Sequence, residues 1–332
     1  MKKLAVAILA LLMAAVLIGC SLDSLEGYKK AAEKTEQIKK GRTDGEFLLV
    51  MDFNTEGMTE EQIRELNYFK NIKGSFNTAY DDEQKKEVFR NYLSFGGIGF
   101  DYDLFINGEE IFVKLPVIGK YMRIDDIQAP ITKDQKKGKA ELIDPETKDA
   151  INDKWLKLLQ KEDIFKGSST VLTTPDGEVK ATEYTIRLND EQIKSLAEYS
   201  IDMLSRDEKL EERFGKYIRE NVKHHKDVSL KKLLSDMKEN INKYTVESFG
   251  YTAYVDIDGY IVNEIVEITL KVNSTEAAAM NGLSYKLDIK NWDINKAQKF
   301  DFPELTDENT VDIDSINQSM PFNIEVLFND EN

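Results

Sequence analysis

The sequence predicts an α+β protein built on an antiparallel sheet. The first observation is that alternating apolar residues fill paired segments joined by tight-turn residues, as at Asn107-Gly108 and Asp258-Gly259, a pattern typical of β-hairpins. The second is that segments with helical periodicity lie between the hairpins, without the regular strand–helix–strand order of a parallel sheet. We therefore expect one antiparallel sheet, completed by strands from both ends of the chain.

The first part of the folded body is predicted to be helix, strand and helix. Residues 24–40 place apolar side chains three and four positions apart, with Ser24 as the N-cap and Gly41 after the last turn, which indicates a helix. Residues 45–54 are apolar on both faces and predict a strand. A second helix is expected over 59–69, which opens with the Thr-x-x-Gln spacing of a capping box.

Three hairpins and four further helices follow in the prediction. The hairpin strands are expected over 96–106 with 110–115, 168–174 with 179–188, and 249–257 with 260–272. A further strand is expected over 283–289. The helices are expected over 145–160, 189–204, 210–222 and 230–244, and the first of them opens with a proline, which fits a first helical position.

The expected domain organisation is simple, because no linker rich in proline, glycine or serine divides the chain. Residues 25–305 are predicted to form a single domain with a helical insertion at about 189–246. An acidic C-terminal tail over 306–332 follows. The alternative is two domains that split near 130–165.

The N-terminus has the pattern of an export signal. A short basic start precedes an uncharged run over residues 4–18, rich in Ala, Leu, Ile and Val, which is too short for a membrane span of about 20 residues. The run ends in a motif that resembles the bacterial lipobox: Leu17, Ile18, Gly19 and Cys20. The alternative is an ordinary signal peptide with an incidental cysteine.

The lipobox resemblance implies that residues 1–19 are a lipoprotein signal peptide and that Cys20 becomes a lipid-modified N-terminus. Residues 20–24 would then be a lipidated tether. A diacylglyceryl group supplies two acyl chains, which suffice for a stable anchor. We expect a protein held on the extracytoplasmic face of the cell membrane, and the heavy use of Lys, Asn, Ile and Glu is typical of bacteria with a single membrane.

Composition excludes several functions. The chain has 45 basic and 61 acidic residues and a net charge of −16, whereas nucleic-acid binding needs a basic surface. One cysteine and two histidines do not suffice for a Cys-rich zinc or iron–sulfur site. Neither a Gly-x-Ser-x-Gly nucleophile motif nor a phosphate-binding glycine motif occurs in the sequence. We therefore expect no enzymatic activity, no metal and no cofactor.

Several predicted strands are apolar on both faces, notably 47–53 and 98–106. A strand of this kind is covered on both sides. The cover is either packed helices or an apolar ligand held in a concave sheet. In the second case, the candidate cavity-lining residues are aromatic and methionine side chains of the predicted strands: Phe47, Met51, Phe53, Phe100, Tyr102, Phe112 and Tyr251.

The order of lipobox, N-terminal helix and long hairpins with apolar inner faces resembles the lipoprotein-carrier superfamily of LolA and LppX type. The segments Asn107–Pro116 and Tyr254–Val262 look like hairpins of such exported lipoproteins. The resemblance implies a curved antiparallel sheet, or half-barrel, with helices packed on its concave face and an acyl chain between them. It assigns no individual ligand-binding residue.

The expected function is therefore that of a membrane-anchored extracytoplasmic lipoprotein that binds a lipid or other apolar ligand in a half-barrel cavity. The alternative is an envelope protein-interaction or regulatory module without a small-molecule ligand, whose protein partner the sequence does not identify. The solute receptor of a transporter would need two lobes with parallel sheets, and a hydrolase would need a nucleophile with its base, so the sequence favours neither.

Overall fold

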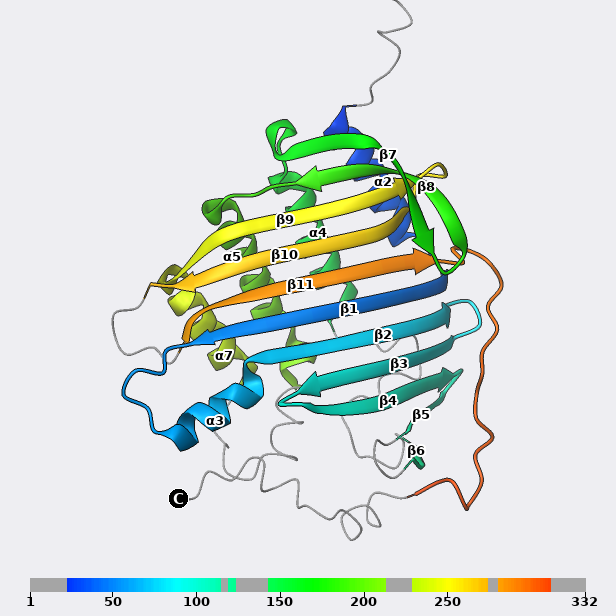
Figure 1. Cartoon of the computed structure of the whole chain (residues 1–332). Coiled ribbons are helices and arrows are strands. Elements are labelled where there is room, and N and C mark those ends of the chain that lie inside the picture. Colours follow the sequence, from blue (N-terminus) through cyan, green and yellow to red (C-terminus); the bar gives the residue numbers. More distant parts are fainter. Residues whose placement is uncertain (1–22, 115–118, 124–142, 213–228, 274–279, 312–332) are drawn as a thin grey trace, which may run out of the picture.

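The computed structural model describes residues 23–114, 119–123, 143–212, 229–273 and 280–311. They form an α+β fold around one antiparallel sheet of eleven strands (Figure 1). The sheet is curved (Figure 1). It is also unclosed, because its two edge strands, β6 (Tyr121–Arg123) and β7 (Ile164–Thr174), stand at opposite ends of the strand order. The α+β class and the antiparallel sheet predicted from the sequence are confirmed.

Two meanders build the sheet and meet at its centre. The first runs outward through β1 (Lys40–Phe53), β2 (Asn71–Asp81), β3 (Lys86–Phe95), β4 (Ile98–Asn107), β5 (Glu110–Lys114) and β6. The second runs inward from β7 through β8 (Gly177–Ile186), β9 (Tyr244–Asp256), β10 (Ile261–Val272) and β11 (Met280–Trp292). Strand β1 pairs with β11. Strands from the two ends of the described chain therefore belong to the sheet, as expected, and lie side by side at its centre.

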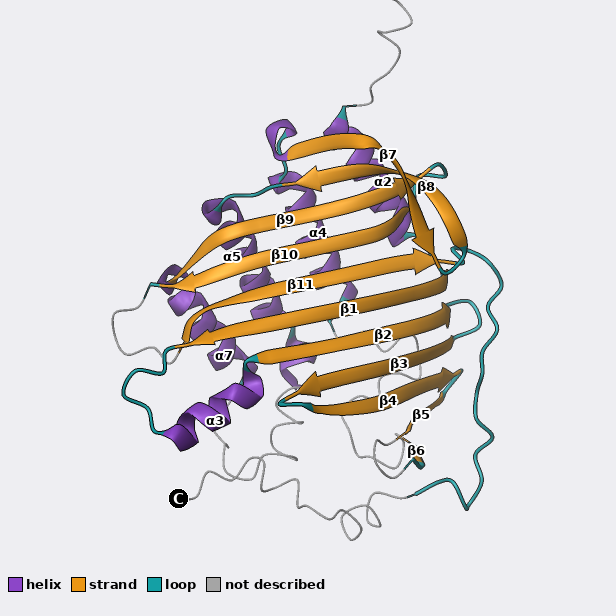
Figure 2. Cartoon of the chain, in the orientation of Figure 1, coloured by secondary structure: helices purple, strands orange, loops and turns teal. Residues whose placement is uncertain are grey.

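Four helices lie together on one face of this sheet, and a fifth stands at its end (Figures 1 and 2). The four are α2 (Ser24–Glu36), α4 (Pro145–Leu158), α5 (Asp190–Arg206) and α7 (Leu230–Asn240). The fifth, α3 (Glu60–Phe69), follows the end of β1 and precedes β2. Single turns of 3₁₀ helix precede β7 and β9. We call the side of the sheet that carries the four helices the helix-covered face.

Side-chain caps explain where several helices begin. Thr59 and Gln62 form the expected capping box of α3, and Asn189 and Gln192 form a second one at α5. Pro145 occupies the first turn of α4, as expected. These local signals fix the N-termini of the helices independently of the sheet.

The main core lies between the helices and the strands β7 to β10. Tyr28 and Ala31 of α2 pack there against Tyr184 and Ile186 of β8 and against Tyr251 of β9. Ile186 is completely buried. A smaller cluster of Ile201, Leu230 and Leu234 holds α5 against α7. The helices are therefore fastened mainly to one half of the sheet.

A second core lies on the opposite face, over the other half of the sheet. Val88, Phe105 and Phe112 are buried there beneath a segment that follows β11, residues 293–311. Phe300 and Phe302 of this segment cover the cluster, and Figure 1 shows the segment running past the strand ends toward β6. It ends by pairing with Tyr121 of β6. The C-terminal segment therefore acts as a cover for β3 to β5.

The structure corrects two details of the N-terminal prediction. Helix α2 ends at Glu36 rather than residue 40, and Asp23 rather than Ser24 is its N-cap. Lys40 and Gly41 instead begin β1 and pair with β2. The reason is that backbone pairing with β2 competes with the helical periodicity, which continues past the true helix end.

Strands β2 and β3 occupy a stretch for which the sequence predicts no element. The helix-covered side of β2 carries Ile72, Gly74, Phe76, Thr78 and Tyr80, so glycine and threonine interrupt the apolar alternation that would have indicated a strand. The short strand β6 was not predicted either. The other strands were predicted, and their observed ends differ from the expected ones by at most about five residues.

Some predictions lie outside the described residues. They are the lipobox with Cys20, most of the helix expected over 210–222, and all but the first residues of the expected acidic tail. Within the described part of the chain, no helix is long and apolar enough to cross a membrane.

Candidate functional site

The helix-covered face carries a continuous apolar surface across the sheet. Residues directly opposite each other in an antiparallel ladder share a face, so the strand register gives its rows. One row crosses seven strands, from β9 to β4: Tyr251, Val266, Leu287, Phe47, Gly74, Leu93 and Phe100. The adjacent row is Phe249, Ile268, Tyr285, Leu49, Ile72, Phe95 and Ile98. Both rows consist of apolar or aromatic residues and one glycine.

The middle of this surface is not sealed by the helices. None of the hydrophobic side chains of the central strands β1 and β11 is buried, although β8, β9 and β10 all contribute to the main core. Their apolar residues on this face remain partly accessible, and we call this set the apolar floor: Phe47, Leu49, Met51, Leu283, Tyr285 and Leu287. A central strand of a large sheet is normally its best-covered part. The apolar side chains of β1 and β11 are therefore less completely covered than those of β8 and β9.

Two cross-strand pairs of a glycine and a phenylalanine join β1 and β2 on the helix-covered face. Gly45 lies opposite Phe76, and Gly74 lies opposite Phe47. A methyl group added at Gly74 would lie 2.5 Å from Cε1 of Phe47, and one at Gly45 would lie 2.2 Å from Cζ of Phe76. The two rings therefore lie over glycine backbone instead of standing away from the sheet. The two glycines therefore allow close packing of aromatic rings between β1 and β2.

A carboxyl group stands at the border between the main core and the apolar floor. Glu264 of β10 lies opposite Ala253 of β9 and Ile289 of β11, on the helix-covered face. Its Oε2 accepts a hydrogen bond of 3.1 Å from the Tyr251 hydroxyl. Burial raises the pKa of the Glu264 carboxyl, and this hydrogen bond opposes the rise.

The partner of Glu264 is held by aromatic side chains from two helices. Tyr251 meets Tyr28 of α2 edge-on with ring centroids 5.8 Å apart, and Trp155 of α4 with centroids 5.7 Å apart. Trp155 donates from Nε1 to the Tyr28 hydroxyl over 3.1 Å. Burial raises the pKa of Tyr28 to about 12, so its hydroxyl stays protonated at neutral pH. The position of Glu264 is therefore defined by a packed, hydrogen-bonded group.

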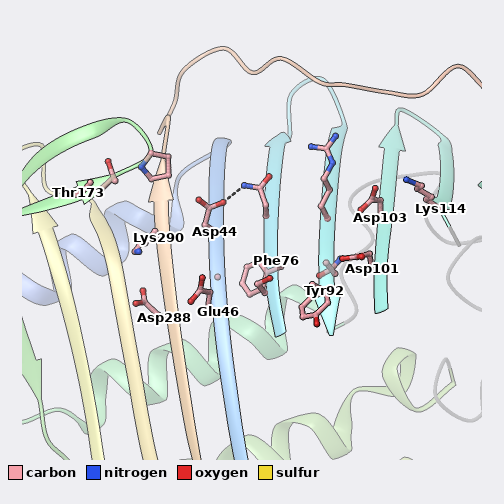
Figure 3. Close-up of a pocket in the computed structure, with 17 residues that line it drawn as sticks. Asp44, Glu46, Phe76, Tyr92, Asp101, Asp103, Lys114, Thr173, Asp288 and Lys290 are labelled. Carbon is pink, nitrogen blue, oxygen red and sulfur yellow. Dashed lines mark hydrogen bonds between the residues drawn. The ribbon is translucent and has the colours of Figure 1, made fainter. Parts of the chain in front are cut away.

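The opposite face of the sheet holds a polar pocket of about 820 Å³ (Figure 3). One row across its base carries charges of alternating sign, with the uncharged Asn77 between Asp44 and Arg90. The row is Lys290, Asp44, Asn77, Arg90, Asp103 and Lys114. The Asn77 amide donates to the Asp44 carboxylate. Charges of opposite sign in adjacent strands stabilise a sheet, and that role accounts for this row. Residues 173–175 of the β7–β8 hairpin border the pocket.

The structure places six of the seven candidate lining residues in or near the rows of the helix-covered face. Phe47 and Met51 belong to the apolar floor, and Tyr251 joins it to the core. Phe100 and Tyr102 lie further along, on β4, where Tyr102 is 40% exposed. Phe53 follows a bulge at the end of β1.

The seventh candidate, Phe112, lies on the other face. Its ring stacks on Phe105 with centroids 4.9 Å apart, inside the core beneath the C-terminal segment. Strand β5 is apolar on both faces, so its alternation does not show which face each side chain occupies. Phe112 is therefore separated by the sheet from the other six.

The prediction missed two contributors to this face. One is β11, whose Leu283, Tyr285 and Leu287 form half of the apolar floor. The other is Glu264, although a signal was present: it occupies the same alternating phase as Val266 and Ile268, whereas Glu267 has the opposite phase. An acidic residue in the apolar phase of a strand can be recognised from sequence alone.

The described residues contain no group of three or more His, Cys, Asp or Glu side chains arranged to hold a metal ion. Apolar residues with a few oriented polar groups are also the usual lining of concave ligand sites. The Asp256–Gly259 segment, which resembles part of a calcium loop, forms the β9–β10 turn, with Gly259 at φ 83°.

Comparisons with known proteins identify no family. No protein-family profile matches the sequence, and no curated protein matches it. Among solved structures, the crystal structure of MucB in complex with MucA(peri) aligns with 81% of this chain and 94% of that chain, at 8% identity and a TM-score of 0.10. A TM-score this low carries no argument about fold or function.

Proposed function

We propose that this chain is a membrane-anchored extracytoplasmic lipoprotein that binds a lipid or other apolar ligand between the helices and the centre of its sheet. In this proposal the sheet acts as a half-barrel of LolA type, and the segment at about 189–246 is a helical insertion that covers it. Cys20 carries the anchor, and the apolar floor contacts the ligand.

The observation that supports the proposal is the accessible apolar floor at the centre of the sheet. Leaving apolar surface in contact with water costs about 25 cal/mol per Å². A protein without a ligand would gain stability by packing helices onto β1 and β11, as it does on β8 and β9. In addition, the rings of Phe76 and Phe47 lie close over Gly45 and Gly74 instead of standing out from the sheet. An acyl chain fits such a surface, because it contributes apolar contacts and needs no hydrogen bonds.

Photolabelling in a bilayer tests the proposal. The full chain is incorporated into phosphatidylcholine vesicles that contain a lipid with a photoactivatable diazirine on its acyl chain, and labelled peptides are mapped by mass spectrometry. We expect labels on the peptides of β1 and β11. Leu287→Asp should lower this labelling about tenfold or more, because an ionised carboxylate is strongly disfavoured in an apolar site.

Two variants make the result specific. Ser284→Asp adds the same charge to the same strand but on the opposite, exposed face, and it should label like the wild type. Leu287→Trp occupies space without adding charge, and should lower labelling while the far-ultraviolet circular dichroism stays unchanged. Wild-type protein without labels on β1 and β11 would contradict ligand binding and favour the interaction module.

A further inference from the structure

We propose that Glu264 hydrogen-bonds the polar head of the bound ligand, and that this ligand is a single-chain lipid with an uncharged, hydroxyl-bearing head. The inference rests on the proposed function and deepens it, because it names the ligand class. A long-chain monoacylglycerol represents this class, whereas a lipid with a phosphate head does not.

The first step is the isolation of this carboxyl on an apolar face. Among the described residues of β9, β10, β11, β1 and β2 that the register assigns to the helix-covered face, Glu264 is the one charged side chain. A buried polar group costs free energy unless it is hydrogen-bonded, and a charge costs more. A strand that needed only packing at this position would carry valine or isoleucine, as β10 does at Val266 and Ile268.

The second step is that the main core encloses Glu264 on one side only. Ala253, directly opposite on β9, has no exposed surface, and Tyr251 is 8% exposed. Glu264 itself is only partly buried, as is Ile289 on its other side. The β9 side of Glu264 is therefore closed, whereas its β11 neighbour, next to the apolar floor, is only partly buried.

The third step is the hydrogen-bonding capacity that remains. Tyr251 donates to Oε2 over 3.1 Å, and a protonated carboxyl can additionally donate one hydrogen bond and accept others. Burial raises the pKa of Glu264, which favours this protonated form. A head with hydroxyl groups can both accept from and donate to it. A phosphate head would be repelled whenever the carboxyl ionises, and its own desolvation would be costly.

The fourth step is the length of the apolar rows on the helix-covered face. From β10 to β4 there are five strand spacings of about 4.8 Å, or about 24 Å across the sheet. One leaflet of a bilayer's hydrocarbon core is about 15 Å thick. A single acyl chain that starts at Glu264 can therefore lie across β11 and β1 without leaving the apolar rows.

The test compares two photoactivatable probes with the same diazirine-bearing acyl chain, a monoacylglycerol and a lysophosphatidic acid. The full chain is presented with each probe in phosphatidylcholine vesicles. The wild type should label more strongly with the monoacylglycerol. Glu264→Leu should lower monoacylglycerol labelling about tenfold, which is the loss of about 1.4 kcal/mol of binding free energy expected for one hydrogen bond.

Rescue and control variants separate recognition from structural support. Glu264→Gln keeps a donor and an acceptor at the same position and should retain most of the monoacylglycerol labelling. Glu267→Leu removes a carboxylate from the same strand, but from the opposite phase of its alternation, and should label like the wild type. The lysophosphatidic acid signal should not fall in Glu264→Leu.

Each alternative result has a defined meaning. Unchanged monoacylglycerol labelling in Glu264→Leu, with Leu287→Asp still defective, would overturn the role of Glu264 while the proposed function stands. Equal loss of both probes in Glu264→Leu would show that the carboxyl only supports the fold. Absence of floor labelling in the wild type with either probe would overturn the proposed function and this inference together.

Discussion

At the residue scale, the central strands depend on glycines that accept aromatic rings. Gly74 faces Phe47 across the β1–β2 ladder, and its position is also close to backbone: a methyl group there would lie 2.8 Å from the carbonyl oxygen of Tyr92. No rotation of Phe47 removes that second contact. Glycine at this position is therefore required by the close approach of β3 as well as by the ring.

This requirement gives a stability prediction with an internal control. Gly74→Ala should destabilise the protein by about 1–3 kcal/mol, because overpacking forces side-chain and backbone shifts. Gly250→Ala, in β9, meets no atom within 4 Å and should be neutral or stabilising by up to about 1 kcal/mol. Urea unfolding followed by tryptophan fluorescence measures both. Equal stability of the two variants would contradict the assigned packing.

At the element scale, the C-terminal segment replaces a second layer of helices on the opposite face. Phe300 and Phe302 stack with centroids 5.6 Å apart over Phe105 and its neighbours. The segment has no regular secondary structure beyond its bridge to β6. Its side chains, rather than backbone pairing along its length, therefore hold it in place.

Alanine substitutions at two adjacent residues of this segment should differ sharply in their effect on stability. Phe302→Ala should cost about 2 kcal/mol, below the range for a fully buried phenylalanine, and should speed proteolysis and amide exchange over 293–311. Asp301→Ala should cost less than about 0.5 kcal/mol, because its 3.6 Å contact with Arg90 is exposed to solvent. Equal protection of the segment in both variants would show that backbone contacts hold it.

At the scale of the whole molecule, the acidic charge opposes attachment to an anionic membrane, whereas the predicted lipid anchor promotes attachment. Loss of residues 1–19 would remove Lys2 and Lys3 and leave 43 basic against 61 acidic residues. A body with that balance is repelled by an anionic membrane surface, so a lipid at Cys20 would have to supply the attachment. The described chain begins at Asp23, whose carboxylate pairs with Lys161 Nζ at 2.5 Å, and this pair would tie the tether to the body near β7.

Cys20→Ala tests the anchor in cells. The wild type should fractionate with membranes and show the mass of an acylated N-terminal peptide. The variant should lose that modification and either become soluble or keep residues 1–19 uncleaved. Ser21→Ala is the matched control and should behave as the wild type. An unmodified Cys20 in membrane-bound wild-type protein would contradict the lipobox prediction.

Short-range sequence signals were enough to predict the local features of this protein. Capping residues at Thr59 and Asn189, the proline at 145, and the turns at Gly108 and Gly259 act within a few positions, so their elements were predictable. Alternation in 249–257 and 260–272 revealed the β9–β10 hairpin for the same reason. All seven candidate lining residues were correctly predicted to lie on strands, but alternation did not show that only six of them share the helix-covered face.

The way distant strands combine follows from long-range contacts in the folded protein. The pairing of β1 with β11 depends on backbone hydrogen bonds between opposite ends of the described chain, and these leave no local trace in either segment. That pairing sets the rows that unite Phe47, Leu287 and Tyr251, and it places Glu264 at the border of the apolar floor. Phe112 shows the converse: where a strand is apolar on both faces, burial by a remote segment decides which core each side chain joins.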